Sequence, residues 1–221
     1  MCLMYGRLTL AYQSIWYFTN LPKTIVDTIE VDLEQYKLEN NLEESRIGGG
    51  GRDTDIRNAR NTWIPSSHWT AGFLWHYVMK ANRENFLYDL TQIDGESMQY
   101  TVYGEGEHYT WHSDADMVGA YKPQAVNNIP QGPNQQAIID DFVMRNTETM
   151  RKLSFSIQLS DPDDYEGGQF QLLDEGNRSY IAPRDKGTII LFDSRTKHRV
   201  RPVTKGVRKS IVGWVVGPRW R

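Results

Sequence analysis

The spacing of hydrophobic residues changes near Gln99, and the two sides of this point predict different structure. Upstream, apolar residues recur at the three- and four-residue spacing of a helix with one buried face, in two separate stretches. The first stretch predicts a helix over about 22–38, which begins at a proline. The second predicts a helix that Ser66 or Ser67 caps and that ends near Asn85.

Downstream of Gln99, short runs of alternating apolar and polar residues are separated by glycine, proline and aspartate. Such runs are typical of half-buried strands in a sandwich or a barrel. The predicted strands cover 98–103, 108–112, 153–160, 168–173, 187–193, 198–203 and 208–216. We therefore expect a single domain over 1–221, in which a mainly helical flank, 1–97, covers one face of a β core, 98–217.

The overall composition narrows the functional classes. The chain of 221 residues has a formal net charge of -3, which gives no general attraction for nucleic acid or for an anionic membrane. Its one cysteine, Cys2, excludes an intrachain disulfide and fits a reducing compartment. The apolar stretch 8–18 is too short to span a bilayer and lacks a signal-peptide cleavage pattern. We therefore expect a cytoplasmic protein that does not act at a membrane.

A His-x-Asp pair on a predicted strand is the first candidate metal site. On an extended chain His112 and Asp114 point to the same side, so both can bind one ion. A third ligand, His198, lies on a later predicted strand. Two histidines and one carboxylate on one face of a metal leave the opposite face open. Non-haem Fe(II) oxygenases bind a cosubstrate and dioxygen at such open positions.

Arg208, ten residues after His198, extends this pattern. Its guanidinium can form a two-pronged ion pair with a carboxylate, and a dicarboxylate that chelates the metal at one end needs such an anchor at the other. Ser210 and Trp214 share a face of the same predicted strand. Ser210 can therefore donate a further hydrogen bond to that carboxylate, and Trp214 can form a wall of the site.

The segment 117–150 fits neither the helical nor the strand pattern. Its middle is rich in Asn, Gln, Pro and Gly, and so long a loop in a compact domain is usually functional or without fixed structure. Because it directly follows His112 and Asp114, it is either a lid over the site or an insertion without a role.

The order of these motifs resembles the 2-oxoglutarate/Fe(II) oxygenases, in particular the prolyl 4-hydroxylase-like group. The matching text is YxxGxxYxxHxD over 103–114, RKLSFSIQLS over 151–160, EGGQF over 166–170, GTIILFD over 187–193, HRVRPV over 198–203 and GVR over 206–208. The similarity covers about 99–214, more than half of the chain. It implies a double-stranded β-helix, which is a jelly roll with flanking helices.

The resemblance also implies residue roles. It implies that Fe(II) is bound by His112, Asp114 and His198 and that Arg208 binds the far carboxylate of 2-oxoglutarate. It further implies that Tyr103 lines the cosubstrate pocket. Ascorbate is a candidate additional cofactor.

Four further site residues are predicted, and two of them conflict with simple patterns. Tyr109 matches a family tyrosine that lies near the cosubstrate or substrate. On a regular strand, however, its side chain would lie on the face opposite His112. Either the strand bulges there or Tyr109 belongs to the core. Gln158 stands where relatives often have a tyrosine or an apolar residue, so it either binds the cosubstrate or is an exposed strand residue. Trp111 and Trp214 are candidate aromatic walls for a substrate.

The resemblance implies hydroxylation of an aliphatic carbon, coupled to oxidative decarboxylation of 2-oxoglutarate by dioxygen. The first substrate candidate is a peptidyl side chain such as proline, and the next is a free amino acid or small metabolite. Nucleic acid is disfavoured as a partner. Two other classes stay open: a non-catalytic metal-binding jelly-roll module, and a zinc hydrolase in which Glu105 or Glu107 is the base.

Overall fold

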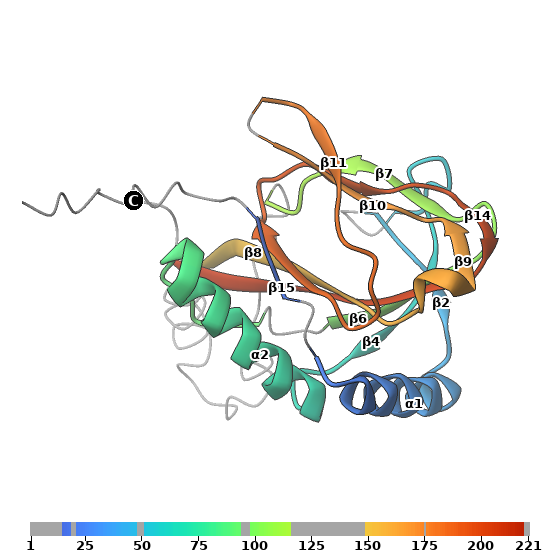
Figure 1. Ribbon diagram of the computed structural model, residues 1–221, viewed down its shortest axis with the longest axis horizontal. Coiled ribbons are helices and arrows are strands. Elements are labelled where there is room, and N and C mark those ends of the chain that lie inside the picture. The colour runs from blue at the N-terminus through green and yellow to red at the C-terminus, as the bar shows by residue number, and fades with distance from the viewer. Residues whose placement is uncertain are drawn as a thin grey trace, which may run out of the picture.

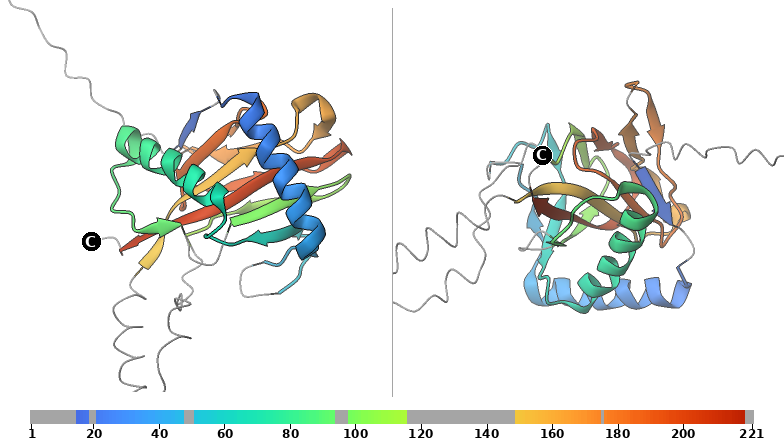
Figure 2. Two further views of the ribbon diagram at one scale, coloured as in Figure 1. Left: turned by 90° about the horizontal axis from the view of Figure 1, so that it is seen from below. Right: turned by 90° about the vertical axis from the view of Figure 1, so that its left-hand side faces the viewer.

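Two β-sheets lie face to face in this computed structural model, and two helices cover the outer side of the larger sheet (Figure 1; Figure 2). The structure describes residues 15–18, 21–47, 51–93, 98–115, 149–174 and 176–218. The larger sheet contains β1 (Ile15–Phe18), β2 (Glu43–Glu44), β4 (Arg60–Ile64), β5 (Gln92–Ile93), β6 (Met98–Tyr103), β8 (Thr149–Gln158), β12 (Ile189–Asp193) and β15 (Arg208–Pro218). The smaller sheet contains β3 (Arg57–Asn58), β7 (His108–His112), β10 (Phe170–Leu173), β11 (Ser179–Ile181) and β13 (His198–Val200).

The strand order is that of a double-stranded β-helix. The larger sheet runs β1-β12-β8-β15-β6-β4-β2, with β5 paired to β15, and the smaller sheet runs β11-β10-β13-β7-β3. Two short strands, β9 (Tyr165–Gly167) and β14 (Val203–Gly206), pair with each other beside the two sheets. The jelly roll that the sequence predicts is therefore confirmed.

The predicted strands downstream of Gln99 are all present, and β6 and β7 have the predicted bounds. The upstream flank differs from the prediction, because it supplies β1 to β5 as well as helices. These strands contain two to five residues, too few for an alternating pattern to stand out. Their places are set by the strands with which they pair.

The two predicted helices are present as α1 (Lys23–Asn40) and α2 (Trp69–Ala81). Pro22 stands at the N-cap of α1, as predicted. The predicted serine caps of α2 are wrong by one or two positions. The cap is His68, whose ring Nδ1 accepts a hydrogen bond from the backbone N–H of Thr70 at 3.4 Å. A single π-helical turn, Asn82–Phe86, continues α2 to the predicted end.

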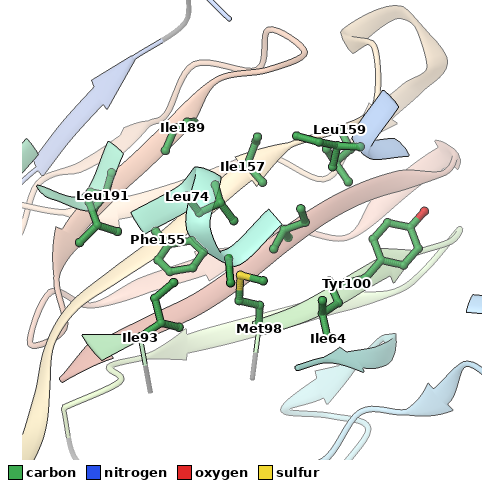
Figure 3. Close-up of a cluster of buried hydrophobic side chains, with 14 of the residues drawn as sticks. Ile64, Leu74, Ile93, Met98, Tyr100, Phe155, Ile157, Leu159, Ile189 and Leu191 are labelled. Atoms are coloured by element: carbon green, nitrogen blue, oxygen red, sulfur yellow. The ribbon is translucent and has the colours of Figure 1, made fainter. Parts of the chain in front are cut away.

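The hydrophobic core lies between the larger sheet and the helices (Figure 3). Along β8, Phe155 and Ile157 point into this core, while Ser154, Ser156 and Gln158 alternate with them and face the space between the sheets. Each fully buried apolar side chain contributes about 1.5–3 kcal/mol relative to an exposed one. The apolar side of β8 therefore anchors the strand and leaves its polar side for the interior of the jelly roll.

The predicted lid, 117–150, lies outside the described residues except for its last two positions, which begin β8. Neither α1 nor any other helix in the described ranges combines the length and apolar character that a membrane span requires.

Candidate active site

A cavity of about 310 Å³ lies between the two sheets of the jelly roll. The smaller sheet contributes His112 and His198, and the larger sheet contributes Tyr103, Ser154 and Ser156. The aromatic ring of Phe192 packs against His198, with ring centroids 4.6 Å apart. The cavity therefore has an apolar wall and a polar wall, as small-molecule sites usually do.

The three predicted metal ligands converge inside this cavity. One ligand atom from each of His112, Asp114 and His198 lies within 4.8 Å of the other two. His198 pairs directly with His112 between β13 and β7, so the sheet places the two rings side by side. The carboxylate of Asp114 approaches both rings, with Oδ1 3.9 Å from His112 Nε2 and Oδ2 3.5 Å from His198 Nε2. This donor set fits a divalent iron ion.

Each imidazole is oriented by a backbone carbonyl. His112 Nδ1 lies 2.8 Å from the carbonyl of Thr110, and His198 Nδ1 lies 3.0 Å from the carbonyl of Thr196. Because a carbonyl only accepts, both Nδ1 atoms carry the proton and donate it. Both Nε2 lone pairs are thereby free to bind a metal.

Asp114 is held in a buried polar cluster. Its Oδ2 accepts a hydrogen bond of 2.7 Å from the hydroxyl of Ser154, whose oxygen is 3.0 Å from that of Ser194. Its backbone N–H donates to the carbonyl of Ser194 at 2.9 Å. These contacts fix the direction of the carboxylate. Ser154 belongs to strand β8, and Ser194 lies in the turn after β12. The sequence motifs single out neither serine for this role.

The local environment keeps His112 and Asp114 in the protonation states that metal binding requires. Burial and the neighbouring His198 lower the pKa of His112 to about 3, so its ring is neutral at neutral pH. Burial raises the pKa of Asp114, but the adjacent His198 and His112 and the Ser154 hydroxyl outweigh it, so the pKa is lowered overall. The site thus presents neutral imidazole and a carboxylate anion.

Tyr109 lines the cavity on the same side as His112. The pairing of β7 with β13 shifts by one residue between His112 and Tyr109, which is a β-bulge. The bulge reverses the alternation, and the Tyr109 ring stacks on His112 with centroids 3.5 Å apart. Burial raises the pKa of Tyr109 to about 12, so its hydroxyl stays protonated and can donate a hydrogen bond. Of the two alternatives left by the sequence, the structure shows the bulge.

Arg208 is 1% exposed and has only neutral partners among the described residues. Its Nη2 donates to Gln158 Oε1 at 2.9 Å and its Nη1 to Ser210 Oγ at 3.4 Å, while its Nε has no partner. Tyr103, paired with Arg208 between β6 and β15, has its ring centroid 5.5 Å from the guanidinium carbon. A buried cation without an anion is costly, and an anionic ligand at this position would offset that cost.

Two adjacent glycines allow close packing beside Arg208. Gly167 and Gly168 both have positive φ angles, 73° and 60°. A Cβ atom on Gly168 would lie 3.2 Å from Arg208 Cδ, and one on Gly167 would lie 2.3 Å from the Pro202 carbonyl oxygen. Only Gly168 therefore leaves space for Arg208 itself, while Gly167 allows the close approach of the neighbouring backbone. Gln158 is buried and oriented toward Arg208, so the interpretation of it as an exposed strand residue is wrong.

The two predicted tryptophan walls lie in different places. Trp214 lines the cavity, and the guanidinium carbon of Arg151 lies 4.0 Å above its ring. Trp111 is not among the residues that line the cavity. Its ring is covered instead by Arg199, whose guanidinium carbon lies 4.5 Å away. The substrate role predicted for Trp111 is therefore not supported by its position, because it alternates with His112 on β7.

The glutamates that a zinc hydrolase would need as a base also lie elsewhere. Glu107 forms an ion pair with Arg60 at 3.3 Å and accepts from the N–H of Gly104. Glu105 accepts from the N–H of Gly206. Neither glutamate lines the cavity that holds the three ligands.

Sequence reasoning also missed three arginines of the cavity, Arg46, Arg57 and Arg151. Arg57 is buried, on a two-residue strand with no recognisable pattern. A charged residue in so short an element carries no signal for burial.

Comparison with known proteins agrees with this geometry. The sequence profile described as the 2OG-Fe(II) oxygenase superfamily matches residues 98–216, more than half of the chain. A PKHD-type hydroxylase from Synechococcus sp. (strain JA-3-3Ab) is 39% identical over 79 residues, 34% of either chain. One from Colwellia psychrerythraea is 29% identical over 147 residues, 66% of this chain and 64% of that one. The matched segment thus spans only about a third of the length of the first of these relatives.

Solved structures show the same fold. A Pseudomonas putida prolyl-4-hydroxylase superposes with a TM-score of 0.66 at 17% identity, covering 95% of both chains. A Trichoplax adhaerens prolyl hydroxylase, in complex with a hypoxia-inducible factor peptide, gives a TM-score of 0.66 at 16% identity over 91% of this chain and 83% of that one.

Proposed function

Because the chain belongs to the 2OG-Fe(II) oxygenase superfamily, we propose that it is a 2-oxoglutarate-dependent dioxygenase that hydroxylates an aliphatic carbon. Dioxygen would be the oxidant, Fe(II) would activate it, and 2-oxoglutarate would be oxidised to succinate and carbon dioxide as the substrate gains one oxygen atom. The residues of this chain bind, orient and shield the reactants.

One observation carries the proposal. The guanidinium of Arg208 is buried, has no acidic partner among the described residues, and belongs to the same jelly roll as the three-ligand site. A non-catalytic metal site has no use for such a cation, and neither does a metal hydrolase. The pair of features fits a dicarboxylate cosubstrate that reaches from the metal to the arginine. In this proposal Gln158 and Ser210 hold the guanidinium, and Tyr103 lines the pocket of the cosubstrate.

For the prime substrate we propose a peptidyl side chain such as proline, with a free amino acid or small metabolite as the alternative. The names of the relatives and of the structural neighbours support hydroxylation of this kind. Tyr109 and Trp214 line the cavity next to the ligands and are the proposed substrate walls. We also propose that ascorbate sustains turnover and that the protein acts in the cytoplasm.

The proposal is tested by turnover in air. Protein loaded with Fe(II) should convert 2-oxoglutarate to succinate, and proline-containing peptides in the assay should gain one oxygen atom, as read by mass spectrometry. Asp114→Ala removes the carboxylate ligand and should abolish both signals, while exposed Asp161→Ala should leave them unchanged. If the wild type formed no succinate, or if the Asp114 variant formed as much, the proposed function would be wrong.

A further inference from the structure

Arg57 is a buried arginine that lines the cavity of the three ligands, and the proposed roles of the metal and cosubstrate residues do not use it. It lies on β3, is 7% exposed, and lines the cavity together with His112 and Asp114. Through the pairing of β3 with β7, Arg57 stands directly opposite Tyr109.

Every described partner of Arg57 is neutral. Its Nη1 donates to the carbonyl of Arg46 at 3.0 Å and its Nη2 to Gln99 Oε1 at 2.8 Å. Its guanidinium carbon lies 4.9 Å from the centroid of the Tyr109 ring. Its Nε is buried and has no hydrogen-bond partner, and no carboxylate of the described residues forms an ion pair with it. A buried cation with no acidic partner in the part of the chain that the structure describes indicates a site for an anion.

The contacts of Arg57 repeat those of Arg208. Each guanidinium uses Nη2 to hold the side-chain oxygen of one glutamine, and each leaves its Nε without a partner. Their glutamines stand on different strands, Gln99 on β6 and Gln158 on β8. The jelly roll therefore contains two separate buried guanidinium groups that could each be the site of an anion.

A dicarboxylate cosubstrate accounts for only one of these sites. One of its ends chelates the metal, where the ion neutralises the carboxylate, and its other end requires one arginine. A second anion site is left for a second molecule. Of the arginines that line the cavity, Arg46, Arg57 and Arg151, only Arg57 is buried, and Glu43 and Glu44 line the same cavity. One buried guanidinium matches the two oxygens of a single carboxylate.

We propose that Arg57 binds a free carboxylate of the prime substrate, an inference that rests on the proposed oxygenase function. The Tyr109 ring stacks on His112 and is covered by Arg57, so only one ring separates the cation from a metal ligand. The carboxylate and the oxidised carbon therefore belong to one residue-sized fragment. This narrows the substrate classes proposed above: the oxidised side chain belongs to the C-terminal residue of a peptide, or to a free amino acid or related small acid, and not to an internal residue of a chain.

The test compares acids with their amides in the same assay. Succinate release by the Fe(II)-loaded protein is measured with the twenty free amino acids and with Gly-Pro and Ala-Pro, each as the acid and as the C-terminal amide. At least one acid should raise succinate release above the substrate-free rate, and its amide should be about 30-fold or more weaker in kcat/KM. Free amino acids and dipeptide acids distinguish the two sources of the carboxylate.

The matched variants are Arg57→Gln and Arg60→Gln. Arg60 is exposed on β4 and pairs with Glu107 away from the cavity. Arg57→Gln should lose the preference for acid over amide, by about 30-fold in kcat/KM, while its affinity for 2-oxoglutarate and for Mn(II) stays within about twofold of the wild type. Arg60→Gln should keep the preference. The binding controls also report whether the Arg57 variant is folded.

The inference is overturned by equal activity on acids and amides, by no stimulation from any acid in the panel, or by an Arg57→Gln protein that keeps the preference. It is also overturned if Arg57→Gln loses affinity for 2-oxoglutarate, since Arg57 would then serve the cosubstrate. Failure of the proposed function looks different, because the wild type would then neither bind 2-oxoglutarate nor form succinate with any probe.

Discussion

The side chains that matter most are each held in place by a hydrogen bond, and these bonds are of two kinds. The carbonyl groups of Thr110 and Thr196, each two residues before its histidine, orient the two imidazoles, whereas Ser154 orients Asp114 and Gln158 orients Arg208 from positions far away in the sequence. The spacing of His112 and Asp114 is visible in the sequence because it follows from strand geometry. Ser154 and Gln158 are brought to their partners only by the tertiary fold, so they leave no local signal.

The hydroxyl of Ser154 should tune metal binding. Ser154→Ala removes the hydrogen bond of 2.7 Å to Asp114 Oδ2 and leaves that carboxylate free to turn. Loss of such a supporting contact typically weakens metal affinity about 10- to 100-fold, and an anaerobic titration with Fe(II) measures it. Ser179→Ala, on the exposed β11, is the control. An unchanged affinity in the Ser154 variant would show that the carboxylate is held by other contacts.

Arg208 should govern the cosubstrate and not the metal. Arg208→Ala removes the buried cation proposed to face the far carboxylate, and the dissociation constant for 2-oxoglutarate should rise about 30-fold or more. Affinity for Mn(II) should not change. Arg201→Ala, at an exposed position nearby in sequence, should alter neither constant. If the Arg208 variant bound 2-oxoglutarate like the wild type, Arg208 would not be the anchor.

At the scale of elements, helix α1 is joined to the larger sheet by a cluster of charges. Glu34 accepts hydrogen bonds from the hydroxyl of Tyr100 and from Lys37, and Lys209 donates to it at 3.0 Å. Lys209 also pairs with Glu30 at 3.1 Å. Helical periodicity predicts α1 and its buried face, but the pairing of its polar face with β6 and β15 depends on the tertiary fold.

This cluster makes stability depend on pH in the acid range. Burial raises the pKa of Glu34, but hydrogen bonds from Lys37, Tyr100 and Lys209 outweigh it and lower the pKa to about 2 from 4.5. The ionised form stabilises the fold above about pH 4.5, and this contribution is lost as pH falls toward about 2. Because the Glu34 side chain is a third exposed, solvent screening limits its contribution to the free energy of unfolding to roughly 1–2 kcal/mol.

Urea unfolding of Glu34→Gln between pH 7 and pH 3 measures the contribution. The variant should be less stable than the wild type at pH 7, and the difference should narrow below about pH 4.5. Glu39→Gln, at an exposed position of the same helix, should match the wild type throughout. A stability difference that is independent of pH would contradict the electrostatic explanation.

Two glycines test how closely the elements pack. A Cβ atom on Gly213 of β15 would lie 2.5 Å from the Phe155 ring, so Gly213→Ala should cost about 1–3 kcal/mol. Gly72 is exposed on α2 with nothing within 4 Å of such an atom, and Gly72→Ala should add about 0.5–1 kcal/mol through helix propensity. In chemical unfolding, the free energy of unfolding should fall for Gly213→Ala and rise for Gly72→Ala. A stabilising Gly213→Ala would contradict the packing described for Phe155.

At the scale of the whole molecule, local periodicity predicts the two helices and a sandwich or barrel of strands, and the resemblance to a known family specifies a jelly roll with three metal ligands. The two-residue strands β2, β3 and β5 escape prediction because their partners determine them. The positions of Tyr109 and Arg57 in the cavity are set by the pairing of β3 with β7 and by the bulge of β7 opposite β13. The interior that results combines a metal site with two buried arginines, and only one of those arginines is suggested by sequence spacing.

The most direct test of the central claim is anaerobic binding of Fe(II) and 2-oxoglutarate to the purified protein, followed by absorption spectroscopy. The account predicts a visible band that requires both Fe(II) and 2-oxoglutarate, saturates at one equivalent of each, and is absent in Asp114→Ala. Absence of this band from the wild type under saturating Fe(II) and 2-oxoglutarate would contradict the assignment of His112, Asp114, His198 and Arg208 to one oxygenase site.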